Sequence, residues 1–257
     1  MAVLKLRGLS LFSGIGGIEK ALEEWVETVH YCEINPYCTR LLKDKMISQE
    51  LSKGKIWEDV RTISINEIGY VNIITAGFPC QDISVAGIGK GLEGERSGLF
   101  FEIMRLAKEI KPEFLFLENV PAITTRGGIR VIKEITSLGY DCRWCIISAS
   151  AVGALQRRER WFLLAKRNET MDCDPTPVTG LQTHSCTDSE LCIKKSRVDT
   201  TDEYWPFKSR ADWQETVCKV PRSFDGVPDW LDRVQAIGNS VVPAQAKEAF
   251  KILCGLK

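Results

Sequence analysis

The sequence lacks an excess of charge of either sign, and it lacks any long hydrophobic run. Its 34 lysines and arginines are balanced by 34 aspartates and glutamates, so the overall basic charge typical of nucleic-acid-binding chains is missing. Binding to a nucleic acid would have to use the local basic clusters at 156–167 and 194–197. The amino-terminal apolar stretch is too short for a signal peptide, and no run reaches membrane-spanning length. We therefore expect a cytoplasmic protein.

The cysteines lack the paired spacing of a disulfide framework or a zinc site. Ten cysteines are scattered through 257 residues, unlike the dense pattern of small disulfide-rich domains. Cys142 and Cys145 form a single C-x-x-C, and a looser group of cysteines and one histidine lies within 173–192. Because a structural zinc site usually needs two tight ligand pairs, we expect no metal and interpret these cysteines as small apolar residues or free thiols.

Apolar runs alternate with amphipathic stretches through the first two thirds of the chain. Continuous apolar runs predict strands at 8–12, 28–33, 71–77 and 113–119. Apolar residues at helical spacing predict helices over 18–26 and 99–110, and the segment 243–253 has proline in its first turn, as many helices do. Strands of this kind alternating with helices predict an α/β fold with a parallel sheet covered on both faces.

The chain changes character after Lys166. The segment 166–224 is polar, shows little periodicity and has one aromatic cluster at 205–213. A regular apolar pattern returns in the segment 225–257. The sequence therefore predicts a large domain over 1–165, a small and largely irregular region over 166–224, and a carboxyl-terminal segment that rejoins the first domain.

A glycine-rich turn, "FSGIGG", follows the first predicted strand. Gly14 and Gly16 would let a ligand approach the backbone at the start of a helix. Glu33 ends the next strand, where an acid commonly binds ribose hydroxyls. This pattern also fits a simple tight turn, and it does not separate NAD from other adenosine cofactors. Asp59 is placed to meet an adenine amine, or it is a helix cap or an exposed loop acid.

Cys80 follows a proline at the end of the strand predicted at 71–77 and precedes a glycine-rich segment, 81–98. A thiol there would lie where parallel sheets bind ligands, and it is a strong nucleophile. Ser84, Lys90 and Arg96 in the segment suit phosphate contacts. The alternative is a buried cysteine before an ordinary surface loop.

Two further stretches carry charged groups suited to chemistry. Glu118 ends the strand predicted at 113–119, where burial would raise its pKa and make it a proton donor; a structural acid is the alternative. Gln156, Arg158 and Arg160 alternate, which in a strand places all three on one face, suited to a phosphate or a base edge. The alternative is a solvated charged edge. "GNSVVP", at 238–243, reads alone as a helix start.

Taken in order, these stretches resemble the DNA (cytosine-5)-methyltransferase family. The matching features are "FSGIGG", Glu33, Asp59, "GFPCQ", "ENV", "QRRER" and "GNSVVP", and together they cover 8–165 and 234–253. The resemblance implies a Rossmann-like methyltransferase sheet with a small target-recognition region. It also implies S-adenosylmethionine as cofactor and double-stranded DNA as substrate.

The resemblance assigns roles residue by residue. Cys80 would add to C6 of a flipped-out cytosine while Glu118 protonates or hydrogen-bonds N3, and the segment 81–98 would close over the base. The implied catalytic residues are Cys80, Glu118, Arg158 and Arg160. The implied cofactor-binding residues are Phe12, Gly14, Gly16, Glu33, Asp59, Pro79, Asn239 and Ser240. The implied substrate-binding residues are Gln81, Ser84, Lys90, Arg96 and Gln156.

The region 166–224 departs from the family pattern, because it is short for target recognition and is not basic. It would read a short or degenerate site, or act partly as a linker. Methylation of a folded RNA and an inactive DNA-binding relative are the alternatives. We expect a monomer, encoded by a bacterium or a phage, that acts alone or beside a separate restriction endonuclease.

Overall fold

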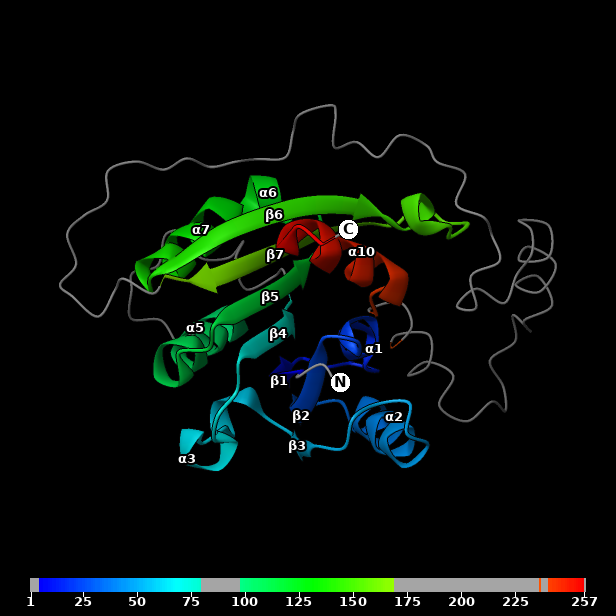
Figure 1. The fold of residues 1–257 in the computed structure, drawn as a ribbon, viewed down its shortest axis with the longest axis vertical. Coiled ribbons are helices and arrows are strands. Elements are labelled where there is room, and N and C mark those ends of the chain that lie inside the picture. The colour runs from blue at the N-terminus through cyan, green and yellow to red at the C-terminus, as the bar shows by residue number, and fades with distance from the viewer. Residues whose placement is uncertain (1–4, 80–97, 169–235, 237–239, 257) are drawn as a thin grey trace.

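The computed structural model describes residues 5–79, 98–168, 236 and 240–256 (Figure 1). Its centre is a seven-stranded sheet in the order β3-β2-β1-β4-β5-β7-β6. The strands are β1 (Leu6–Leu11), β2 (Val26–Cys32), β3 (Lys55–Trp57), β4 (Ile73–Gly77), β5 (Phe114–Asn119), β6 (Tyr140–Ser148) and β7 (Glu159–Arg167). The α/β fold predicted from the sequence is confirmed.

The first five strands are parallel, as the continuous apolar runs predict, but the sheet as a whole is mixed. β7 lies antiparallel to both β5 and β6. The reason is the short connection 149–158 between β6 and β7, because a parallel pair needs a long crossover whereas an antiparallel pair needs only a turn. The parallel sheet expected from the apolar strands is confirmed among the first five strands, and the antiparallel β7 was not expected.

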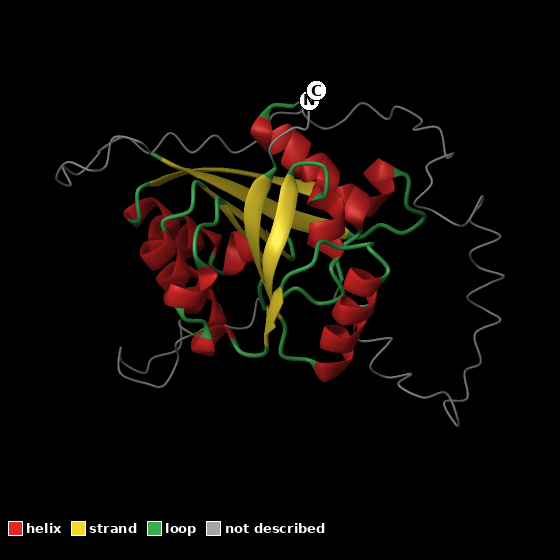
Figure 2. Ribbon diagram, turned by 60° about the horizontal axis from the view of Figure 1, so that its bottom comes forward, coloured by secondary structure: helices red, strands yellow, loops and turns green. Residues whose placement is uncertain are grey.

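Helices cover both faces of the sheet (Figure 2). They are α1 (Gly17–Leu22), α2 (Pro36–Ile47), α3 (Ile65–Ile68), α5 (Leu99–Ile110), α6 (Ile123–Arg126), α7 (Gly128–Ser137) and α10 (Pro243–Cys254), with 3-10 turns η1 (Val60–Thr62) and η3 (Ala149–Val152). None of the helices in the described ranges is both long and apolar enough to cross a membrane.

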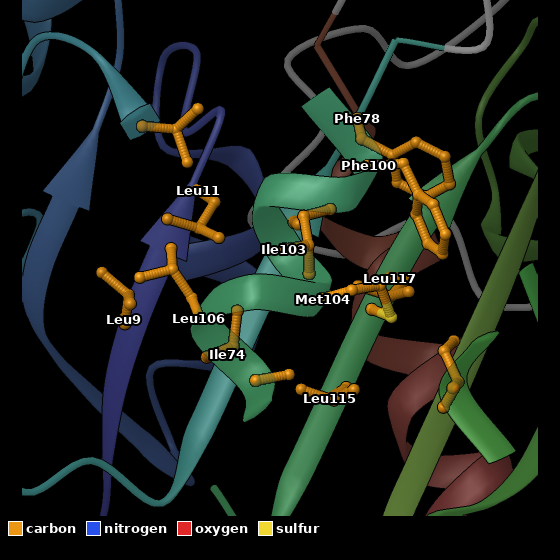
Figure 3. Packing of buried hydrophobic residues seen from close by; sticks show 14 of the residues in the cluster. Leu9, Leu11, Ile74, Phe78, Phe100, Ile103, Met104, Leu106, Leu115 and Leu117 are labelled. Atoms are coloured by element: carbon orange, nitrogen blue, oxygen red, sulfur yellow. The ribbon is translucent and has the colours of Figure 1, made fainter. Parts of the chain in front are cut away.

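Alternate residues of each central strand enter different cores. Leu9 and Leu115 face the core shared with α5, where Ile103 and Leu106 are fully buried (Figure 3). Phe116, next in β5, faces the other core, which α1 and α10 cover. Apolar residues on both faces are what a sheet buried on both sides requires.

Helix α10 comes from the far end of the sequence yet packs against α1, β6 and β7 (Figure 1). The Phe250 ring lies 5.4 Å, centroid to centroid, from both Trp25 and Phe116. α10 begins at Pro243, as predicted. Ser240 and Val241, just before α10, are thereby brought to the carboxyl ends of the central strands. The predicted boundaries at 166–224 fall mostly outside the described residues and stay a prediction.

Candidate active site

A cavity of about 630 Å³ lies at the carboxyl ends of the central parallel strands. Its walls come from the segments that follow β1, β2, β3, β4 and β5, and from Arg160, Ala236, Ser240 and Val241. Open α/β sheets bind ligands at this edge, and the volume suits a ligand the size of a nucleoside cofactor. The predicted site residues that line the cavity are Phe12, Gly14, Glu33, Asp59, Pro79, Glu118, Arg160 and Ser240.

The two glycines of "FSGIGG" serve different purposes. Gly14 has φ +54°, and a Cβ added there would meet no atom within 4 Å, so its backbone lies open to the cavity. Gly16 has φ +84°, and a Cβ would come within 2.5 Å of Leu51 Cδ1. Glycine at position 16 is therefore favoured by its positive φ, and a side chain there would also force Leu51, in the α2–β3 connection, to shift. Phe12, which precedes the turn, also has a positive φ of 56°.

Buried polar contacts support the glycine turn from beneath. Lys45 Nζ, from α2, donates to the carbonyl of Ile15 at 2.7 Å. Ser10 Oγ lies 2.7 Å from Ser13 Oγ and donates to Glu19 Oε1 at 2.5 Å. Burial raises the pKa of Glu19. The sequence patterns did not single out these supporting residues.

Glu33 follows β2 and links the glycine turn to α2. Its Oε2 accepts the Gly14 backbone N–H at 2.7 Å, and its Oε1 accepts the Asn35 N–H at 2.8 Å. Asn35 in turn caps α2, since its side chain accepts the N–H groups of Tyr37 and Cys38. Each carboxylate oxygen keeps a further acceptor site. The residue therefore fits a role in binding cofactor hydroxyls, and the open backbone at Gly14 fits an adjacent cofactor.

Asp59 lines the cavity, but its carboxylate is already engaged. It caps η1 through the Arg61 N–H at 2.9 Å and pairs with the Arg61 guanidinium, with Nη2 to Oδ2 at 2.8 Å. The hydrogen bonds from the Arg61 side chain and backbone hold the Asp59 pKa below its usual range. The helix cap considered from the sequence is thus present, and an adenine contact stays a prediction.

Glu118, the second-last residue of β5, lines the cavity and pairs with Arg160. Their Oε1 and Nε atoms are 2.8 Å apart, and the two side chains are only 12% and 14% exposed. Burial raises the Glu118 pKa to about 7, against the opposing attraction of Arg160 and Arg158. Gly77, opposite in β4, leaves room for the carboxylate, since a Cβ there would lie 3.1 Å from Oε2. A carboxyl group that titrates near neutral pH can give or take a proton.

Asn119 fixes the backbone that leads to the predicted nucleophile. Its Nδ2 donates to the Phe78 carbonyl at 2.9 Å, and its Oδ1 accepts the Val120 N–H at 2.8 Å. The side chain is only 3% exposed. Asn119 belongs to the quoted "ENV" triplet, but only Glu118 was assigned a role from it. Pro79 is exposed and lines the cavity.

The three alternating residues of "QRRER" do not share one strand face. β7 begins at Glu159, so Gln156 and Arg158 precede it, and Gln156 is exposed. The strand that would place all three on one face does not extend to Gln156 and Arg158, because the chain is still in the connection from β6 at these positions. Arg158 Nη2 instead donates to the Ser240 carbonyl at 2.7 Å. Arg160, within β7, pairs with Glu118, and the Arg158 charge also acts on Glu118.

Six predicted site residues lie outside the described part of the chain. They are Cys80, Gln81, Ser84, Lys90, Arg96 and Asn239. Their assignment therefore stays a prediction, and the described site consists of the cavity, the Glu118–Arg160 pair and the supporting contacts.

Comparison with known protein families gives a match over most of the chain. A family model described as "C-5 cytosine-specific DNA methylase" matches residues 6–219. The type II methyltransferase M.CviJI of Paramecium bursaria Chlorella virus IL3A is 36% identical over 252 residues, covering 96% of this chain and 59% of the relative. The type II methyltransferase M2.BsuMI of Bacillus subtilis is 34% identical, covering 87% and 55% respectively. The chain thus spans somewhat more than half the length of these relatives.

Solved structures show the same arrangement. A putative DNA modification methyltransferase encoded within an E. coli prophage is 25% identical, with a TM-score of 0.51, covering 67% of this chain and 49% of that one. The S. pombe Dnmt2 methyltransferase is 26% identical with a TM-score of 0.52, covering 64% and 51%. A Spodoptera frugiperda DNMT2 variant, 20% identical with a TM-score of 0.53 and covering 65% and 51%, supports the fold alone.

Proposed function

The chain belongs to the family of C-5 cytosine-specific DNA methylases, and from this we propose that it methylates C5 of cytosine in double-stranded DNA. The observation that carries the proposal is the buried Glu118–Arg160 pair that lines the cavity. A carboxyl group with a pKa of about 7 is available in its protonated form at neutral pH, which the chemistry at cytosine N3 requires.

The methyl donor of this family is S-adenosylmethionine. When bound, it supplies an electrophilic methyl group. The residues that would hold it are Gly14, whose backbone is open to the cavity, and Glu33, whose oxygens keep free acceptor sites. Ser240 and Val241 would close the cavity from the carboxyl-terminal side.

The reaction needs a nucleophile because cytosine C5 is a poor one by itself. We assign this role to Cys80, whose thiolate would add to C6 while Glu118 gives a proton to N3 and so raises the electron density at C5. Loss of the C5 proton after methylation would break the bond between Cys80 and C6. Arg160 would hold Glu118, and Arg158 and Arg160 together would hold the base and its flanking phosphate. The base must leave the duplex first, at a cost of a few kcal/mol.

Further parts of the proposal concern partners and setting. The region 166–224 would recognise the target, the segment 81–98 would close over the flipped base, and Gln156 would lie near the DNA. We propose a cytoplasmic monomer of bacterial or phage origin that acts alone or beside a separate restriction endonuclease. Its relatives come from bacteria and a chlorella virus and carry names of type II methyltransferases, which is consistent with this setting.

Methyl transfer from labelled S-adenosylmethionine tests the proposal. Duplex DNA is incubated with the protein and digested to nucleosides, and the label is expected in 5-methyldeoxycytidine. Cys80→Ser and Glu118→Gln serve as variants, and both should lose the label, the first completely.

Parallel reactions with tRNA separate the DNA and RNA alternatives. Label in tRNA but not in DNA would replace the proposal by RNA methylation, and no label in either would overturn it. DNA carrying 5-fluorocytosine should become covalently attached at Cys80 in the presence of cofactor, because the fluorine cannot leave as the proton does.

A further inference from the structure

Gln245, in the first turn of α10, is a fully buried polar residue outside the motifs assigned so far. It is 0% exposed. Its Nε2 donates to the Ile147 carbonyl of β6 and, at 2.7 Å, to the Arg158 carbonyl just before β7. One side chain of the carboxyl-terminal helix thus connects the adjacent ends of two strands.

The two carbonyls flank Arg160. Ile147 is the residue opposite Arg160 in the β6–β7 register, and Arg158 precedes Arg160 by two positions. On the β5 side the pairing of β7 begins only at Trp161, and on the β6 side the Arg158 carbonyl also accepts the Ala149 N–H at 2.9 Å. The segment therefore lies at the end of the strand ladder, where strands open readily. Gln245 therefore anchors the chain at the point where the Arg160 side chain leaves it.

A second contact ties the same segment to the cavity wall. Arg158 Nη2 donates to the Ser240 carbonyl at 2.7 Å, and Ser240 lines the cavity. The turn before α10 and the first turn of α10 thus bind the 158–160 segment through two separate hydrogen-bonded contacts.

Retaining an amide at this position has a cost. The Gln245 Oε1 atom is buried and has no hydrogen-bond partner among the described residues. A buried polar atom without a partner is unfavourable, and an apolar side chain of similar length would avoid that penalty. The two hydrogen bonds from Nε2 are what the amide adds over an apolar side chain.

We propose that Gln245 is a positioning residue that holds the 158–160 backbone so that the Arg160 guanidinium stays on Glu118. The proposal rests on the proposed function for its meaning in catalysis, but the contact itself can be tested without turnover. The charged groups facing Glu118 are Arg160 and Arg158, both held by this segment. Loosening the segment should therefore weaken the attraction that opposes the effect of burial on Glu118.

The test compares Gln245→Met with Phe250→Leu. Methionine keeps the length of the side chain but removes the donor. Phe250→Leu removes packing from the same helix at a residue that contacts Trp25 and Phe116 instead of the 158–160 segment. Carbon-13 NMR of carboxyl-labelled glutamate, with Glu118→Gln to assign the signal, measures the Glu118 pKa without any substrate.

Gln245→Met should raise the Glu118 pKa by at least half a unit. Phe250→Leu should leave the Glu118 pKa unchanged, although it destabilises the protein as much or more. In single-turnover methyl transfer, Gln245→Met should slow the reaction at least tenfold and shift the alkaline limb of its pH profile to higher pH. Cofactor affinity should change less than twofold.

An unchanged Glu118 pKa in Gln245→Met, or an equal shift in Phe250→Leu, would overturn the proposal whether or not the wild type methylates DNA. Absence of methyl transfer by the wild type together with the expected pKa shift would instead refute the proposed function alone. If Gln245→Met does not fold, Gln245→Asn, whose amide is too short to reach both carbonyls, replaces it with the same expected direction.

Discussion

The Glu118 carboxyl group links the chemistry of the site to the stability of the protein. Burial raises its pKa from 4.5 to about 7 in the folded chain. A carboxyl with a raised folded-state pKa stabilises the fold fully below its unfolded pKa, and this contribution is lost as pH rises through the folded pKa. Since one pKa unit corresponds to about 1.4 kcal/mol, roughly 3 kcal/mol should be lost between pH 4.5 and pH 7.

Glu118→Gln should remove this pH dependence, because the amide does not titrate. We expect the wild type minus Glu118→Gln difference in unfolding free energy to fall by roughly 3 kcal/mol between pH 4.5 and pH 8. Urea unfolding of both proteins across this range measures the difference. A constant difference would show that the carboxyl group titrates normally in the folded protein.

Asn119 is the second residue whose role can be isolated. Asn119→Asp keeps the acceptor for the Val120 N–H but replaces the donor to the Phe78 carbonyl with an oxygen. The resulting repulsion should cost about 1–3 kcal/mol and displace the backbone leading to Pro79. If this cost falls on the transition state, single-turnover methyl transfer should fall roughly 5- to 150-fold.

Cofactor affinity is the control for Asn119→Asp, measured with S-adenosylhomocysteine. Asn119 lines the cavity, but its side-chain hydrogen bonds go to Phe78 and Val120. Those of Glu33 go to Gly14 and Asn35, so we expect the affinity to fall less than the rate. An equal loss of affinity and rate would indicate general disruption of the cavity rather than a local effect.

At the scale of elements, the sequence predicted those helices and strands whose apolar residues form a regular pattern. The four buried strands and α5 were found because their apolar residues are continuous or helically spaced. α2 was missed because its buried positions include Cys38 and Thr39, which do not read as an apolar stripe. The edge strand β6 was also missed, because Asp141 and Arg143 alternate outward and interrupt the run.

The glycine turn allows a prediction in which two similar substitutions have different effects. Both glycines have positive φ, so alanine costs about 1–2 kcal/mol at either position. At Gly16 the new Cβ would also lie 2.5 Å from Leu51 Cδ1, whereas at Gly14 it meets no atom within 4 Å. Gly16→Ala should therefore be the less stable variant in urea unfolding.

Cofactor binding should show the opposite order. Gly14 lines the cavity, so Gly14→Ala should weaken S-adenosylhomocysteine binding more than it weakens folding. The double variant Gly16→Ala, Leu51→Ala relieves the contact and should be less destabilising than the sum of its single changes. Equal stability of the two single alanine variants would contradict this reading of the turn.

Across the whole molecule, the sequence could predict only those site residues that belong to a motif of the resembling family. Ser240 was expected near the cofactor through the resemblance, and the structure brings it to the cavity wall. Gln245 and Asn119 could not be found, because their partners are backbone carbonyls of Arg158 and Phe78, which leave no trace in side-chain patterns. Such contacts depend on tertiary packing alone.

Residues from both ends of the described chain line the cavity. Ligand binding should therefore stabilise the whole protein against unfolding. The cavity walls include Phe12 near one end and Val241 near the other, so the binding site exists only in the folded protein. A ligand at one hundred times its Kd should then add about 2.7 kcal/mol to the unfolding free energy. For a domain of this size that corresponds to a rise in Tm of roughly 5–10 °C.

Thermal unfolding with and without S-adenosylhomocysteine measures this effect. The transition should stay single, because a ligand bound by segments from both chain ends stabilises the whole sheet together. Glu33→Ala should unfold at a lower temperature and show a smaller ligand-induced rise, since the Gly14 N–H loses its acceptor. If the unfolding curve split into two transitions and the ligand raised the temperature of only one, the two ends of the chain would fold independently. That result would contradict the packing of α10 against α1 and β7.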